Sequence, residues 1–105
     1  MKKRIGLTLI SVAAMLTATA VFAQSGADTY KAKCVMCHAA DGSGATPAGK
    51  ATKTPSFKSP EVAKRSTAEL IAATKNGKGK MPAYAGRLTG AQITEVVAYI
   101  RTLQK

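Results

Sequence analysis

Tryptophan is absent from this chain of 105 residues, and histidine, cysteine and acidic residues are scarce. Two cysteines and one histidine exclude a scaffold of several disulfide bridges and leave at most one link or one site. Only 5 acidic residues stand against 16 basic ones, and a formal charge of +11 suits nucleic acid, anionic lipid or an acidic protein as partner. The length suffices for one domain, and a hydrophobic content of 46% excludes a wholly disordered chain.

Charged residues are missing from positions 5–23, directly after a basic triplet at positions 2–4. This pattern, followed by small residues at the −3 and −1 positions of a cleavage site that ends at Ala23, is typical of a secretory signal peptide. We therefore expect residues 1–23 to be the signal peptide and residues 24–105 the mature domain. An uncleaved membrane anchor is the alternative, because about 19 apolar residues can just cross a bilayer.

Cleavage would remove three basic residues and no acidic ones, so that the mature domain would keep a formal charge of +8. Export predicts a periplasmic location, where two cysteines would normally oxidise to each other unless another group uses them. Nucleic acid is not expected as a partner there, and the five aromatic residues form no base-stacking motif.

Capping patterns divide the mature domain into helices, and no window alternates as a strand does. Ser25 and the acidic residue after it predict a first helix that ends near His38. A Ser-Pro-Glu start predicts a short helix over about 59–65. Capping boxes predict longer helices over 66–76 and from Thr89 to the C-terminus.

The expected fold class is therefore all-α, with three main helices, one short helix and long loops at 39–58 and 77–88. Such a small domain buries a low share of its surface and usually needs a metal, a disulfide or a cofactor. Long loops in a compact domain usually serve a function. The small size and the long loops together predict that a bulky apolar group fills the centre of the domain.

The strongest motif is Cys34-Val-Met-Cys37-His38. Two thiols at this spacing can reach the two vinyl groups on one edge of a haem, and the adjacent histidine can bind the iron. A zinc site would need a fourth ligand, a thioredoxin-like pair would need βαβ patterning, and a surface disulfide would explain neither His38 nor the missing core. The motif predicts haem c, attached covalently through Cys34 and Cys37.

His38 is the only histidine, so it is the expected fifth iron ligand. Its other ring nitrogen needs a hydrogen-bond acceptor to hold the tautomer. The backbone carbonyl of Pro47, in the turn-rich loop, is a candidate for that acceptor.

With no second histidine, the sixth iron ligand is a methionine, a lysine or nothing. We predict that it is Met81. Met15 leaves with the signal peptide, and Met36 lies inside the attachment motif. Met81 lies in a polar, glycine-rich loop where a core methionine is not expected. Lys78 or Lys80 could compete at alkaline pH. Ligation by His and Met favours reduced iron.

These residues resemble the class I c-type cytochromes, the small soluble mono-haem proteins of the bacterial periplasm. Besides the cysteine motif, the resemblance rests on Met81-Pro82, on Gly26 and Tyr30 in the first helix, and on Val96 and Tyr99 in the last. It implies a cytochrome c fold wrapped around one haem. It also implies that the first and last helices cross at the glycine, with an aromatic residue from each packed nearby.

Iron with six ligands has no open position for a substrate, so the expected function is one-electron transfer between redox partners, such as those of a respiratory chain, without enzymatic activity. The alternative is a haem-based sensor or weak peroxidase-like catalyst in which Met81 is displaceable. Carbon monoxide binding by the reduced protein would distinguish the two.

Lysines flank both predicted haem-binding segments. If they surround the exposed haem edge, they would steer redox partner proteins with acidic docking surfaces; a solvated basic surface is the alternative. We expect a monomer without stable membrane insertion once the signal is cleaved. The lysines are Lys31, Lys33, Lys75, Lys78 and Lys80. Because the family's tryptophan for the haem propionates is missing, the candidates for those contacts are Arg87, Lys50 and Lys53.

Overall fold

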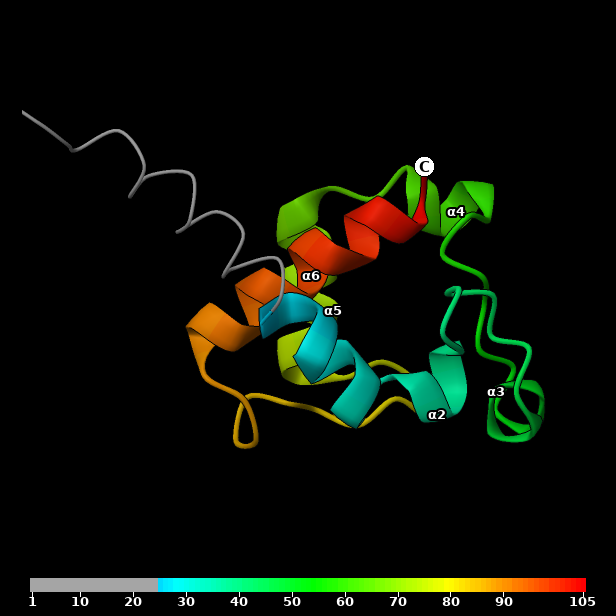
Figure 1. Ribbon diagram of the computed structural model, residues 1–105, viewed down its shortest axis with the longest axis horizontal. Coiled ribbons are helices and arrows are strands. Elements are labelled where there is room, and N and C mark those ends of the chain that lie inside the picture. Colours follow the sequence, from blue (N-terminus) through cyan, green and yellow to red (C-terminus); the bar gives the residue numbers. More distant parts are fainter. Residues whose placement is uncertain (1–24) are drawn as a thin grey trace, which may run out of the picture.

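The computed structural model describes residues 25–105, so the predicted signal peptide lies outside the described residues. Residues 25–33 are helical, and they are followed by α2 (Val35–His38), α3 (Pro47–Ala51), α4 (Pro60–Ala63), α5 (Thr67–Asn76) and α6 (Gly90–Leu103) (Figure 1). Within this part of the chain the extended pairing is limited to an isolated bridge between Lys78 and Met81. The predicted all-α class is confirmed. No helix among residues 25–105 is long and apolar enough to cross a membrane.

Helices α5 and α6 begin at the predicted capping boxes. The Ser66 hydroxyl accepts a hydrogen bond from the Glu69 N–H, and the Glu69 carboxylate accepts one from the Ser66 N–H, both at 3.1 Å. Thr89 and Gln92 make the same reciprocal pair before α6, at 3.1 and 2.8 Å. Each box satisfies two backbone donors that a helix start leaves without an intrahelical partner.

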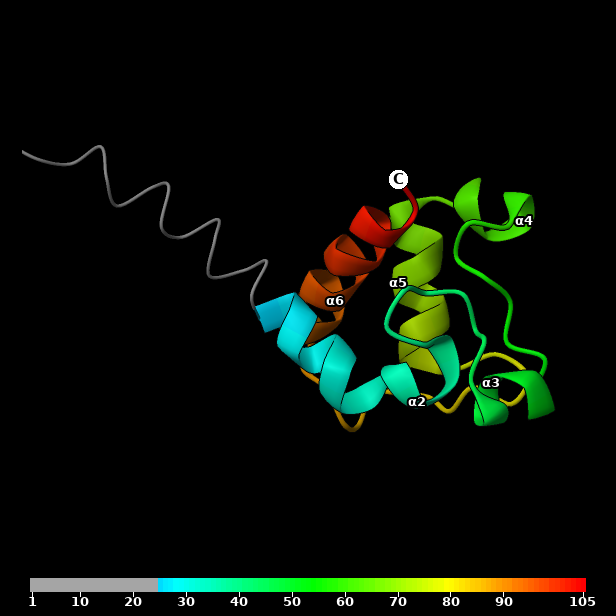
Figure 2. The same cartoon turned by 45° about the vertical axis from the view of Figure 1, so that its right-hand side comes forward.

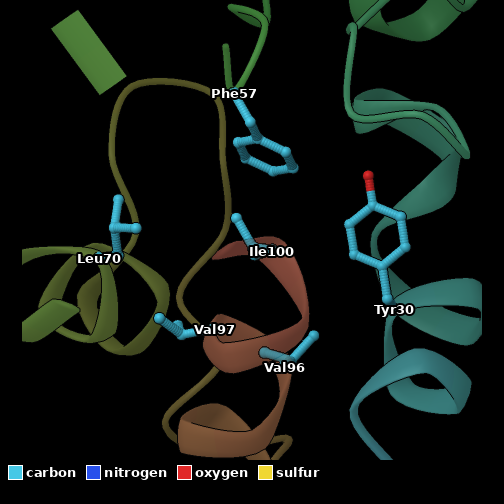
Figure 3. Close-up of a cluster of buried hydrophobic side chains, with 6 residues drawn as sticks. All are labelled: Tyr30, Phe57, Leu70, Val96, Val97 and Ile100. Carbon is cyan, nitrogen blue, oxygen red and sulfur yellow. The ribbon is translucent and has the colours of Figure 1, made fainter. Parts of the chain in front are cut away.

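The core is built around α6. Its side chains pack against Leu70 of α5 on one side and face Tyr30 of the first helix on the other, and Phe57 approaches from the loop between α3 and α4 (Figure 3). Val96 and Val97 have no exposed surface, so they belong to the buried apolar face of this helix. The cluster comprises Tyr30, Phe57, Leu70, Val96, Val97 and Ile100.

The first helix crosses α6 at Gly26 (Figure 2). A Cβ atom at this position would overlap the backbone carbonyl of Glu95 and lie 3.2 Å from the Cβ of Tyr99. The rings of Tyr30 and Tyr99 pack beside the crossing with centroids 5.2 Å apart, and the Tyr30 hydroxyl donates to the Ala39 carbonyl at 2.5 Å. The crossing and its two aromatic residues are therefore as predicted.

Two local features differ from the prediction. The first helix does not run unbroken to His38, because Cys34, at φ −118°, forms a turn between residues 25–33 and α2. The predicted loop 39–58 contains the short helix α3, which begins with Thr46 as N-cap and a proline at its first position. That start has the pattern that marks helix beginnings elsewhere in the chain, so the sequence did contain a signal for it.

We predict that Gly26→Ala destabilises the protein by about 1–3 kcal/mol, because the added methyl group must push the first helix away from α6. Urea unfolding would measure this loss. Gly90→Ala is the matched control, since a Cβ at Gly90 meets nothing within 4 Å. Equal stability of the two variants would contradict a close crossing at Gly26.

Candidate functional site

A cavity of about 840 Å³ lies between the first helix and α2 on one side and α5 and α6 on the other. This volume lies within the range of about 300–1,000 Å³ that is usual for small-molecule and cofactor sites. All four predicted site residues, Cys34, Cys37, His38 and Met81, line it. Much of the remaining wall is apolar, with Val35, Pro55, Phe57, Leu70, Ala73, Val96 and Ile100.

The attachment motif is held in a single turn of backbone. The N–H groups of Cys37 and His38 both donate to the Cys34 carbonyl, at 3.3 and 3.0 Å. Burial raises the pKa of the Cys34 thiol to about 11.

The His38 imidazole is held by an aromatic neighbour. Its ring stacks on Phe57, with centroids 4.6 Å apart and an interplanar angle of 16°. Burial lowers the pKa of His38, which favours the neutral form that can bind a metal. Its Nδ1 atom is buried and has no hydrogen-bond partner within the described part of the chain.

The predicted acceptor for His38, the Pro47 carbonyl, does not serve as one in this structure. Pro47 is instead the first residue of α3. A buried polar nitrogen without a partner is unfavourable, so the His38 imidazole lacks one of the hydrogen bonds that would hold its ring.

Met81 is positioned by a tight turn in the loop after α5. The N–H of Met81 donates to the Lys78 carbonyl at 3.0 Å, and the N–H of Lys78 donates to the Met81 carbonyl at 3.1 Å. The turn needs glycine just before it, because Gly77 has φ +78° and an added Cβ would lie 2.7 Å from the Met81 carbonyl oxygen. Met81 is half-buried, whereas Met36 is 77% exposed.

Thr46 is a positioning residue that the sequence analysis missed. Its hydroxyl donates to the Met36 carbonyl at 2.6 Å and accepts from the Gly49 N–H at 2.9 Å, so it joins the attachment motif to α3. Gly49 completes this contact, because a Cβ there would overlap the backbone carbonyl of Cys37. The Thr-Pro pair that begins α3 is the signal that could have revealed it.

Four of the five lysines predicted to lie near the haem edge line the cavity, and one does not. Lys31, Lys33, Lys78 and Lys80 line it as expected, but Lys75 is exposed and not part of its wall. Six basic residues and one acidic residue, Glu61, line the cavity among the residues that the structure describes.

Three basic residues were candidates to contact the haem propionates. Of these, Lys53 lines the cavity, whereas Lys50 and Arg87 do not. Arg65, which the sequence analysis did not select, also lines it. Lys53 has φ +56°, an unusual backbone conformation for a side chain of this type. It lies between Thr52 and Thr54, whose hydroxyls are 2.8 Å apart.

The chain is similar to known proteins over most of its length. Residues 22–100 match the family described as subunit III of cbb3-type cytochrome c oxidase. The chain is also 34% identical to a cytochrome c6 from a Nostoc species, covering 91% of this chain and 84% of that protein. A cytochrome c6 from a Picosynechococcus species is 34% identical over 95% of this chain and 92% of its own length.

The chain belongs to the class I c-type cytochromes. Its cofactor is accordingly haem c, an iron porphyrin attached covalently, and Cys34 and Cys37 fit the attachment motif. The residues present suit that group, since two thiols, an imidazole whose lowered pKa favours its neutral form, and a thioether line one largely apolar cavity. A third relative, cytochrome c6 of Leptolyngbya boryana, is 36% identical over 74% of this chain and 88% of its own.

We predict that Thr46→Val lowers the free energy of unfolding of the haem-loaded cytochrome by about 1 kcal/mol, because it removes both the cap of α3 and the bond to the Met36 carbonyl. Thr46→Ser keeps the hydroxyl and should remain close to the parent protein. Thermal unfolding measures both variants. A valine variant as stable as the serine variant would show that the hydroxyl does not hold the motif.

Proposed function

We propose that this cytochrome carries single electrons between redox partner proteins in the periplasm, on haem c attached through Cys34 and Cys37. His38 and Met81 would bind the haem iron. The observation that supports this proposal most directly is that all four side chains line one cavity, although Met81 is far from the others in sequence. Haem iron supplies the one-electron step, because it alternates between two oxidation states.

The chain's own residues would prepare the site for rapid electron transfer. Stacking on Phe57 restrains the His38 ring, and burial favours its neutral form. The double hydrogen bond to Lys78 holds the backbone of Met81 in place. Apolar walls limit access of water, which together with a methionine ligand favours a raised reduction potential.

The same arrangement argues against an enzyme. A peroxidase-like catalyst or a gas sensor needs a vacant or displaceable position at the metal, whereas in the proposed arrangement His38 and Met81 would both bind the iron. We therefore propose that the protein has no catalytic activity of its own.

The basic residues around the cavity favour acidic docking surfaces on the partners. Six cationic side chains and one carboxylate line it within the described part of the chain, so an approaching acidic surface would be attracted toward the cavity. We further propose that the protein is exported, with cleavage after Ala23, and acts as a monomer. The intact mass and the sedimentation of the exported protein test these two points.

Optical spectra of the purified protein, with acid–acetone extraction, test the central proposal. Haem that resists extraction, low-spin bands, and the weak near-infrared band of a sulfur–iron bond in the oxidised protein are the expected results. Extractable haem would contradict covalent attachment. High-spin bands that shift readily with carbon monoxide would instead support a sensor or catalyst.

We predict that Met81→Ala abolishes the sulfur–iron band and lowers the reduction potential, because the thioether ligand is lost. Met36→Leu is the matched control, since Met36 is 77% exposed and belongs to the attachment turn. Spectroscopy and potentiometric titration measure the two effects. An unchanged potential in Met81→Ala would assign the sixth position to another residue.

We predict that the double variant Lys78→Gln with Lys80→Gln is oxidised by the anion hexacyanoferrate(III) about twofold or more slowly at low ionic strength, because it removes charge beside the cavity. The double variant Lys50→Gln with Lys58→Gln loses the same charge from exposed residues that do not line the cavity, and should change less.

Stopped-flow kinetics at rising salt would measure these rates. The difference should disappear near 1 M salt, where the screening length is about 3 Å. Equal slowing of both double variants would show that net charge, and not the position of these lysines, controls the encounter.

A further inference from the structure

The loop that carries Met81 reaches across to the first helix through one side chain, Tyr84. The Tyr84 hydroxyl donates to the backbone carbonyl of Lys33 at 3.2 Å, joining residues 51 positions apart. Lys33 is the last helical residue before Cys34, so this bond joins the Met81 loop to the segment that leads into the attachment motif. Tyr84 and Lys33 both line the cavity.

Within residues 25–105, the other hydrogen bonds of this loop join it to α5 or to itself, and not to the first helix. The N–H groups of Tyr84 and Ala85 donate to the Thr74 and Lys75 carbonyls of α5, at 3.0 and 3.1 Å, and so fasten the end of the loop to α5. Within the described residues, the Tyr84–Lys33 bond is the only hydrogen bond between residues 77–88 and residues 25–58. The two loop backbone bonds at Met81 shape its turn but do not hold the turn against the first helix.

We propose that the Tyr84 hydroxyl is a clamp that holds the Met81 loop against the first helix and so keeps Met81 at the cavity. Tyr84 is thus a positioning residue for Met81, and the inference rests on the proposed function because that function makes Met81 an iron ligand. The Tyr84 ring is separately held: it is half-buried, and the Arg87 guanidinium lies 5.7 Å from its centroid. Tyr84→Phe therefore removes the clamp while keeping the ring.

Loss of one neutral hydrogen bond should increase opening of the loop by about 2- to 10-fold. In oxidised, haem-loaded Tyr84→Phe, added imidazole should displace the methionine at a correspondingly lower concentration, which is followed by loss of the sulfur–iron band. In the reduced protein, exchange of the Met81 amide hydrogen, which is bonded to the Lys78 carbonyl, should accelerate by a similar factor.

Tyr99→Phe is the matched control. Tyr99 is also half-buried and near the first helix, and its hydroxyl makes no hydrogen bond within residues 25–105. This variant should leave imidazole binding and Met81 exchange as in the parent protein. The clamp is overturned if Tyr84→Phe matches the parent in both measurements, or if Tyr99→Phe changes them equally.

The two readouts separate this inference from the proposal beneath it. A parent protein without the sulfur–iron band would contradict Met81 as ligand, and amide exchange at Met81 would still show whether the Tyr84 hydroxyl restrains the loop. A parent protein with the band, whose Tyr84→Phe variant behaves normally, would retain Met81 as ligand and contradict the clamp alone.

Discussion

The close crossing of the first helix over α6 determines where the chemistry of this cytochrome is located. Because Gly26 has no side chain, the first helix can rest on the backbone of α6 near Glu95. The helix then continues through the turn at Cys34 into α2, so the crossing positions both cysteines and His38 relative to α6. The bond from Tyr30 to the Ala39 carbonyl secures the far end of this unit.

The second constraint is the small size of the domain. Side chains around α6 form a core on one side, and the cavity occupies the space between that core and the attachment segment. Phe57 belongs to both, since it packs in the core cluster and stacks on His38. A haem in this cavity would bury the apolar walls that the protein cannot bury by itself, so the same group would serve stability and electron transfer.

Several parts of the site could be predicted because their information is local. The capping boxes of Ser66 and Thr89 lie within four consecutive residues, and so determine helix starts without reference to the rest of the fold. The attachment motif is equally short. Helix α3 was missed because its Thr46-Pro47 start lies among turn-forming residues, and the Pro47 carbonyl was chosen from spacing along the chain, which says nothing about the direction of a carbonyl.

By itself, then, the sequence determined the all-α class, the haem-attachment motif and most of the helix boundaries, because each depends on residues within about two helical turns. Tertiary structure decided which lysines lie beside the cavity, that Lys53 and not Lys50 or Arg87 lines it, and that the Tyr84 hydroxyl reaches Lys33. Those facts arise where distant segments meet, and their positions follow from packing against α5 and α6 and not from distance along the chain.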